Sequence, residues 1–276
     1  MLRYSAFSRD PAGGNPAGVV LDARGLDERE MLAVAAEVGF SETAFLVPAD
    51  GGFDVRFFSP RAEVSFCGHA TIASAVAHAE RHGAGGLRYR TAAGDVDVVT
   101  ARDEDGSWRA TLTSVPPVVR DLAPQDLDAL LAALRWSAQD LDPALPARTA
   151  YAGAWHPVVA VRSRQRLADL EHDVAALERL AAARGWTTVD LVWRQDATTF
   201  HARNPFPAGG VVEDPATGAA AAALGGYLRA GGHVPLPARL TVLQGEDLGR
   251  PSTLHVAVPA DPAAGVAVTG AAVAMP

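Results

Sequence analysis

The chain carries a single cysteine, Cys67, directly before a Gly68-His69 step at the predicted start of an alanine-rich helix. The first N–H groups of a helix have no partner within the helix, so a thiol, an imidazole and free amides there can hold an anion or move a proton. Cys67 is either a nucleophile or thiol base activated by the helix start, or a small buried residue. His69 is an acid–base group, a hydrogen-bond donor or a capping residue.

Two carboxylates are further candidates for acid–base chemistry. Glu42 lies in SETAF (41–45), where a strand is predicted to begin, and alternation along that strand places its side chain on the same face as Ala44 and Leu46. A carboxylate there can take a proton from a substrate, or it can be a surface glutamate at a strand end. Asp214 precedes a second alanine-rich helix and is either a second catalytic group or an N-cap.

Composition excludes several classes of function. All 24 basic residues are arginine, so neither a lysine Schiff base nor a Walker A lysine exists. One cysteine allows no intrachain disulfide and no cysteine-rich zinc site. The net charge of −8 without a basic cluster argues against nucleic acid. No apolar run reaches the ~18–20 residues of a membrane helix, and no signal peptide is visible. We therefore expect a cytoplasmic protein that binds neither nucleic acid nor membrane.

The chain contains two similar halves. Aligning His69-Ala70-Thr71 with Pro215-Ala216-Thr217, an offset of 146 residues, superposes two alanine-rich helices that end near Gly83 and Gly231. In both halves β-like segments precede the helix and alternating apolar segments follow it. Chance similarity between alanine-rich helices is the alternative interpretation. The pattern predicts two domains, residues 1–116 with a C-terminal strand 265–276, and residues 117–264.

Small residues along a whole helix predict close packing on every side. Residues 70–79 and 216–226 show no charged face, unlike a surface helix. We expect each to be a central helix wrapped by its own curved sheet. Elsewhere the patterns predict an amphipathic helix over 27–38, capped by Asp27 and stopped by Gly39, further helices over 125–135 and 166–184, and a strand over 151–163.

Two helix starts at matched positions suggest one shared ligand. If the halves pack with pseudo-twofold symmetry, residues 67–69 and 213–219 face a common cleft that can hold a small carboxylate on backbone amides.

Five segments carry a family likeness. These are FSRDPAGGNPAGVVLD (7–22), SETAF (41–45), RFFSPRAEVSFCGHATIASA (56–75), VVEDPATGAAAAALGGYL (211–228) and LQGEDLGRPS (243–252). In this order they resemble the PhzF family, the phenazine-biosynthesis-like group within the diaminopimelate epimerase fold.

The resemblance implies an α+β fold of two pseudo-symmetric domains, each a curved, mostly antiparallel sheet or barrel around a central helix, with the active site between them. It implies proton transfer without a cofactor or metal, and a homodimer. It makes Glu42 the general acid/base, with His69 and Asp214 as the other catalytic residues. The substrate-binding residues that it implies are Asn15, Cys67, Gly68, His69, Gly218 and Ala219.

The chain departs from the phenazine enzymes after its ATG step. They carry serine where this chain has Ala219, so a hydroxyl contact to substrate is missing. A two-cysteine racemase is excluded because the region taken to match Cys67 reads Glu213-Asp214-Pro215.

Three functions follow from these residues. The first is a cofactor-independent isomerase that moves a proton between carbons of a small carboxylic acid. The second is an epimerase or racemase with unlike bases, Glu42 or Cys67 on one face and Asp214 or His69 on the other. The third is a binding protein of the same fold without turnover.

Overall fold

The computed structural model describes residues 1–207 and 211–276, which form two compact units. Unit 1 is Met1–Thr113 with Gly249–Thr253 and Val268–Pro276, and unit 2 is Ser114–Leu248 with Leu254–Ala267. The segment Gly249–Thr253 packs in unit 1, whereas the sequence prediction assigned it to the second half. In the described part of the chain, no helix is long and apolar enough to cross a membrane.

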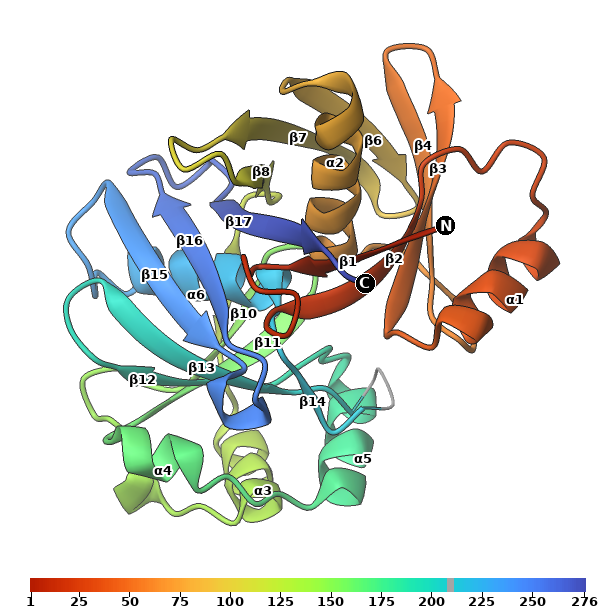
Figure 1. Cartoon of the computed structure of the whole chain (residues 1–276). Helices are drawn as coiled ribbons and strands as arrows, with labels where there is room; N and C mark the ends of the chain where they lie inside the picture. Colours follow the sequence, from red (N-terminus) through yellow and green to blue (C-terminus); the bar gives the residue numbers. More distant parts are fainter. Residues whose placement is uncertain (208–210) are drawn as a thin grey trace. The chain divides into compact units, whose positions relative to one another are not determined.

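Unit 1 contains a closed barrel of eight strands (Figure 1). Hydrogen bonds link the strands in the order β1-β2-β3-β4-β6-β7-β8-β17 and back to β1. The strands are β1 (Leu2–Ala6), β2 (Asn15–Val20), β3 (Glu42–Ala49), β4 (Gly52–Phe58), β6 (Gly86–Thr91), β7 (Gly94–Arg102), β8 (Trp108–Thr113) and β17 (Ala267–Ala274), with the short β5 (Glu63–Val64) paired to β4.

Helix α2 (Gly68–His82) fills this barrel, as the small-residue pattern predicts. It packs against β1, β2, β3, β7 and β8, and Ala70, Ala73 and Ala77 are fully buried. Small side chains let the strands approach this helix from several sides at once. A helix with one apolar stripe packs against its neighbours on one side only.

Helix α1 (Glu28–Val38) also matches its prediction. Asp27 caps its first turn and Glu30 completes a capping box, while Gly39 ends the helix in the left-handed conformation.

Unit 2 is a mixed sheet around its own central helix, α6 (Gly218–Ala230). Hydrogen bonds link its strands in the order β9-β10-β11-β12-β13-β15, and β14 pairs with β13. These strands are β9 (Val118–Asp121), β10 (Arg148–Tyr151), β11 (Trp155–Val161), β12 (Asp190–Arg194), β13 (Thr199–Pro205), β14 (Glu213–Asp214) and β15 (Ala238–Gln244), and β16 (Ser252–Val258) follows them in the chain.

The outer helices of unit 2 cover an apolar cluster. Helices α3 (Pro124–Leu134) and α5 (Val174–Arg184) contribute Leu130, Leu134 and Leu177 to it, and α4 (Arg164–Ala168) contributes Leu167. Short 3₁₀ turns lie at Ala138–Asp140 and Glu246–Leu248.

Two sequence predictions in unit 2 were too coarse. The expected strand over 151–163 is confirmed only over Trp155–Val161, because Gly153 turns the chain at positive φ between the end of β10 and the start of β11. The expected helix over 166–184 is two helices, since Asp173 starts a new one by capping the N–H of Ala176.

The repeat is real, but its register differs from the sequence alignment. In both units an antiparallel strand pair, a crossover to a parallel strand, an antiparallel partner and a two-residue strand precede the central helix. The helices begin at Gly68 and Gly218, an offset of 218 − 68 = 150 rather than 146. Runs of alanine fit several registers equally well, so they could not define the offset. Cys67 therefore corresponds to Thr217, and His69 to Ala219.

Two adjacent glycines let neighbouring chain segments touch α6 on different sides. A Cβ at Gly225 would lie 3.0 Å from side-chain atoms of Val258 and Val266, and a Cβ at Gly226 would collide with the ring of Pro117.

We expect Gly226→Ala to lower the free energy of unfolding by about 1–3 kcal/mol, because overpacking outweighs the ~1 kcal/mol that alanine gains in helix propensity. Urea unfolding checks this, and Gly85→Ala, where a Cβ meets nothing within 4 Å, is the control. A Gly226→Ala protein as stable as the wild type would contradict the packing described.

A buried polar chain crosses the sheet of unit 2. Thr188 Oγ1 donates to Asn204 Oδ1 at 2.7 Å, so its contact with His156 Nδ1 at 2.8 Å requires that this nitrogen donates. Asn204 Nδ2 donates to Asp190 Oδ1 at 3.1 Å. Among the described residues, His156 Nε2 and Asp190 Oδ2 have no hydrogen-bond partner. Burial lowers the pKa of His156 to about 4 and raises the pKa of Asp190 to about 7, so both side chains favour their neutral forms.

These buried hydrogen-bonded residues predict that Asp190→Asn changes the pH dependence of the free energy of unfolding. Between the ordinary value of 3.8 and about 7, folding of the wild type requires Asp190 to keep a proton that the unfolded chain releases. The wild type therefore loses stability relative to the variant by about 1.4 kcal/mol per pH unit across that window, and by nothing further above it. Urea unfolding of both proteins from acid to neutral pH measures the difference. A pH-independent difference would show that Asp190 is ionised in the folded protein throughout.

Candidate functional site

The start of α2 brings together three of the predicted site residues. Glu42 is the first residue of β3, Cys67 is the N-cap of α2, and His69 is in its first turn. Cys67 Sγ lies 3.7 Å from Glu42 Oε2 and 3.3 Å from His69 Nδ1, and His69 Nε2 lies 3.4 Å from the same carboxylate oxygen. Ser41 Oγ is 3.4 Å from His69 Nε2. We call Glu42, Cys67 and His69 the unit 1 cluster.

This cluster is buried but not sealed. The exposed fractions of Glu42, Cys67 and His69 are 7%, 8% and 5%, so each residue keeps a small surface in contact with solvent. Glu42 is therefore not a surface glutamate. All of residues 42–46 are buried, so the shared strand face of Glu42, Ala44 and Leu46 stays a prediction. A carboxylate between a thiol and an imidazole, at the positive end of a helix, has the partners that proton transfer needs.

The first amides of α2 are not capped by a side chain, and the same is true of α6. Cys67 and Thr217 are the two N-caps, and neither side chain accepts a capping hydrogen bond from a backbone N–H of its helix. Asp27, Ser163 and Asp173 do cap α1, α4 and α5. The first amides of the two central helices thus lack an N-cap side-chain acceptor, as do those of α3, and a helix start of this kind suits an anion.

Asn15 is the first residue of β2, and a residue distant in the chain fixes the turn that precedes it. Arg250 Nε donates to the carbonyl oxygen of Gly14 at 2.7 Å, and its Nη2 donates to that of Gly13. Gly14 has a φ of +67°, and a Cβ there would collide with the carbonyl of Ala6. Desolvation lowers the pKa of Arg250. Asn15 itself is 1% exposed, two residues before the Ala17 that pairs with Glu42.

In unit 2, Asp214 belongs to a second polar cluster at the start of α6. Thr217 Oγ1 donates to Asp214 Oδ2 at 2.5 Å. Gln244, at the end of β15, donates from Nε2 to the Asp214 carbonyl at 2.7 Å and accepts from the Thr217 N–H at 3.1 Å. We call Asp214, Thr217 and Gln244 the unit 2 cluster. Gly218 and Ala219 follow directly, as the first residues of α6.

A buried ion pair anchors the strand that carries Asp214. Arg203 on β13 donates from Nε to Glu213 Oε1 at 3.0 Å, and both residues are 8% exposed. Its Nη1 also donates to the carbonyl of Ala168 at 2.9 Å. Arg203 therefore balances the charge of Glu213 and fixes the short strand that also carries Asp214.

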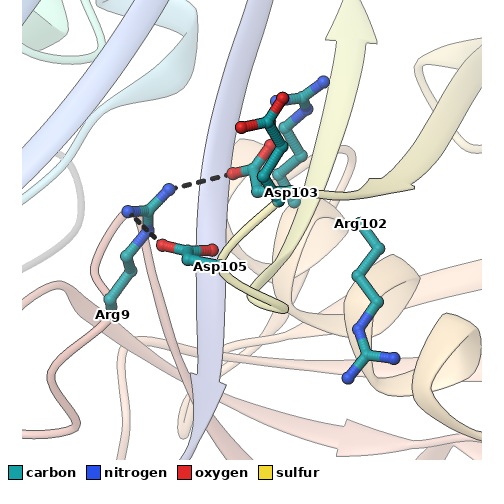
Figure 2. A pocket seen from close by; sticks show the side chains of 6 residues that line it. Arg9, Arg102, Asp103 and Asp105 are labelled. Atoms are coloured by element: carbon teal, nitrogen blue, oxygen red, sulfur yellow. Dashed lines mark hydrogen bonds and ion pairs between the residues drawn. The ribbon is translucent and has the colours of Figure 1, made fainter.

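A hollow elsewhere in unit 1 holds none of the predicted site residues. It has a volume of about 490 Å³ and is lined by Arg9, Arg102, Asp103, Glu104, Asp105 and Arg109. Arg9 pairs with Asp103 at 2.9 Å and with Asp105 at 2.8 Å (Figure 2), and Arg109 also pairs with Asp103. Its three arginines and three acids balance in charge, so it offers a small anion little net attraction.

Sequence reasoning missed four polar residues in or beside these clusters, Ser41, Thr217, Gln244 and Arg250, although all four lie within quoted motifs. Ser41, Gln244 and Arg250 have partners far away in the chain, and Thr217 binds the distant Gln244 as well as the nearby Asp214. Gln244 shows this best, because it follows Asp214 by 30 positions and binds its carbonyl.

We expect Thr217→Val to lower the free energy of unfolding by about 1–3 kcal/mol, since it leaves Asp214 and Gln244 short of a buried partner. Thr217→Ser keeps the hydroxyl and is the matched control. Thermal unfolding compares the two, and equal stability would contradict the hydrogen bonds described.

Comparison with known proteins gives the family. The sequence matches the profile described as phenazine biosynthesis-like protein over residues 4–276. The chain belongs to the PhzF family. An uncharacterized isomerase of Deinococcus radiodurans is 33% identical over 94% of this chain and 87% of its own. The trans-2,3-dihydro-3-hydroxyanthranilate isomerase of Pseudomonas fluorescens is 31% identical over 90% of this chain and 86% of its own.

Solved structures agree with this assignment. The PhzF-family phenazine biosynthesis protein of Bacillus anthracis is 27% identical with a TM-score of 0.88, covering 100% of this chain and 96% of its own. As a PhzF-family member the chain is an isomerase, and its diaminopimelate epimerase-like fold is the one that the motifs predict.

Proposed function

We propose that this PhzF-family enzyme moves a proton between two carbons of a small carboxylic acid without a cofactor. The observation that carries the proposal is Glu42 Oε2, buried and within 3.7 Å of Cys67 Sγ and 3.4 Å of His69 Nε2 at an uncapped helix start. Carboxylate base, imidazole donor and free amides are the groups that an enolate-type proton shift requires.

The reaction follows from the placement of these groups. The amides at the start of α2 bind the substrate carboxylate and stabilise the negative charge that develops when a neighbouring carbon loses its proton. Glu42 takes that proton and returns it to another carbon on the same face. His69 donates a hydrogen bond to a polar group of the substrate and orients it.

We assign Asp214 a supporting role in the same reaction, with Asn15, Cys67, Gly68, Gly218 and Ala219 as substrate-binding residues. Thr217 and Gln244 hold Asp214 in one orientation, which suits a group that must meet a polar atom of the substrate. Ala219 offers no hydroxyl, so we expect a substrate with one polar group fewer on that side than trans-2,3-dihydro-3-hydroxyanthranilate. We also expect a cytoplasmic homodimer.

Glu42→Gln tests this proposal directly. The amide keeps the size of the side chain but cannot accept a proton from carbon, so solvent-deuterium incorporation into a turned-over carboxylic acid should fall by at least about 100-fold. Mass spectrometry of substrate recovered from D₂O measures it. Glu104→Gln, in the charged hollow of unit 1, is the control and should retain full exchange. A Glu42→Gln enzyme that exchanges deuterium normally would exclude Glu42 as the base.

Epimerisation with unlike bases is the second candidate, and the position of Cys67 favours it. Its Sγ lies 3.3 Å from His69 Nδ1, so the imidazole can help to form a thiolate beside the substrate. The configuration of the product decides between the two reactions: a same-face shift moves the double bond, whereas epimerisation inverts one carbon.

A further inference from the structure

We propose that Glu42, Cys67 and His69 form a binding site for a soft divalent cation of the zinc class. We also propose that a bound ion stops the proton-transfer reaction. The inhibition by a bound ion rests on the proposed function of Glu42, whereas the metal site does not. Each residue supplies one ligand atom, and these atoms all lie within 4.8 Å of one another.

The triangle of ligand atoms matches one face of a zinc tetrahedron. Zinc bonds of about 2.0–2.3 Å at tetrahedral angles place sulfur, nitrogen and oxygen ligands roughly 3.4–3.6 Å apart. Here Sγ to His69 Nε2 is 3.8 Å, Sγ to Glu42 Oε2 is 3.7 Å, and Nε2 to Oε2 is 3.4 Å. The three side chains therefore need small adjustments, chiefly of the imidazole ring, and they leave a fourth position open.

The ligand types select for a particular class of ion. Thiolate and imidazole prefer zinc and similar metals, whereas magnesium and calcium prefer oxygen ligands alone. A thiolate and a carboxylate together carry two negative charges, which a divalent cation neutralises in this buried place. The exposed fractions of 5–8% leave the ligand edges within reach of an ion.

Occupation by the ion conflicts with the proposed reaction. A metal on Oε2 takes the lone pair with which Glu42 would accept a proton, and a metal on Nε2 removes the hydrogen-bonding capacity of His69 at that atom. Binding of the ion releases the thiol proton of Cys67 to solvent, and chelation should restore activity because the thiolate takes up a proton again when the ion leaves.

A helical histidine pair gives an internal control. His78 and His82 lie one turn apart on α2, with ring centroids 4.4 Å apart, and two histidines at this spacing are a common adventitious metal site. His82→Gln removes that pair and leaves the unit 1 cluster intact.

Titration of the tag-free protein with CoCl₂ tests binding, because cobalt replaces zinc and a cobalt–thiolate bond gives near-ultraviolet charge-transfer absorption. We expect one cobalt ion per chain, with that absorption, in the wild type and in His82→Gln. ZnCl₂ should displace the cobalt, and MgCl₂ should not.

Cys67→Ser should abolish the charge-transfer absorption. His69→Gln should weaken binding by more than the roughly 10–100-fold that outer ligand partners contribute. Circular dichroism checks that both variants are folded.

The outcomes test the metal site and its inhibitory role separately. Absence of the thiolate absorption, or its loss in His82→Gln, would overturn the metal site. Deuterium exchange that continues with zinc bound would overturn the inhibitory role. If Glu42→Gln remained active while cobalt still bound through Cys67, the proposed function would fall and the metal site would stand.

Discussion

The burial of α2 on all sides is the constraint on which the rest of unit 1 depends. The helix can fill the barrel only because its inner residues are small, and several of its alanines are fully buried. Strands packed from several directions fix the helix in position along its axis and in rotation. Its first turn is therefore held against the start of β3, which places Cys67 and His69 beside Glu42.

The two units use one topology for different chemistry. The structural register matches Cys67 with Thr217 and His69 with Ala219, so unit 1 has a thiol and an imidazole where unit 2 has a hydroxyl and a methyl group. In unit 2 the polarity comes instead from Asp214 on β14 and Gln244 on β15. No second thiol stands at the start of α6, so the exclusion of a two-cysteine racemase holds although the region first matched to Cys67 was wrong.

The sequence predicts the fold well where the signal is local. The caps of α1 and the small residues of α2 and α6 are read directly from neighbouring residues, and the structure agrees. The sequence fails where geometry joins distant segments. Alanine runs do not define the register of the repeat, and the turn at Gly153 divides a segment that reads as one strand. Arg250 on the turn of Gly14 and Gln244 on Asp214 are likewise visible only after folding.

In the proposed reaction the first turn of α2 binds an organic anion next to the carboxyl group of Glu42. A crystal structure with a small unreactive carboxylate tests this binding. We expect anion oxygens within hydrogen-bond distance of the backbone N–H groups of Gly68 and His69, with the carbon skeleton against Glu42. An anion bound instead by Arg9, Arg102 and Arg109 in the charged hollow, with the α2 amides left to water, would contradict it.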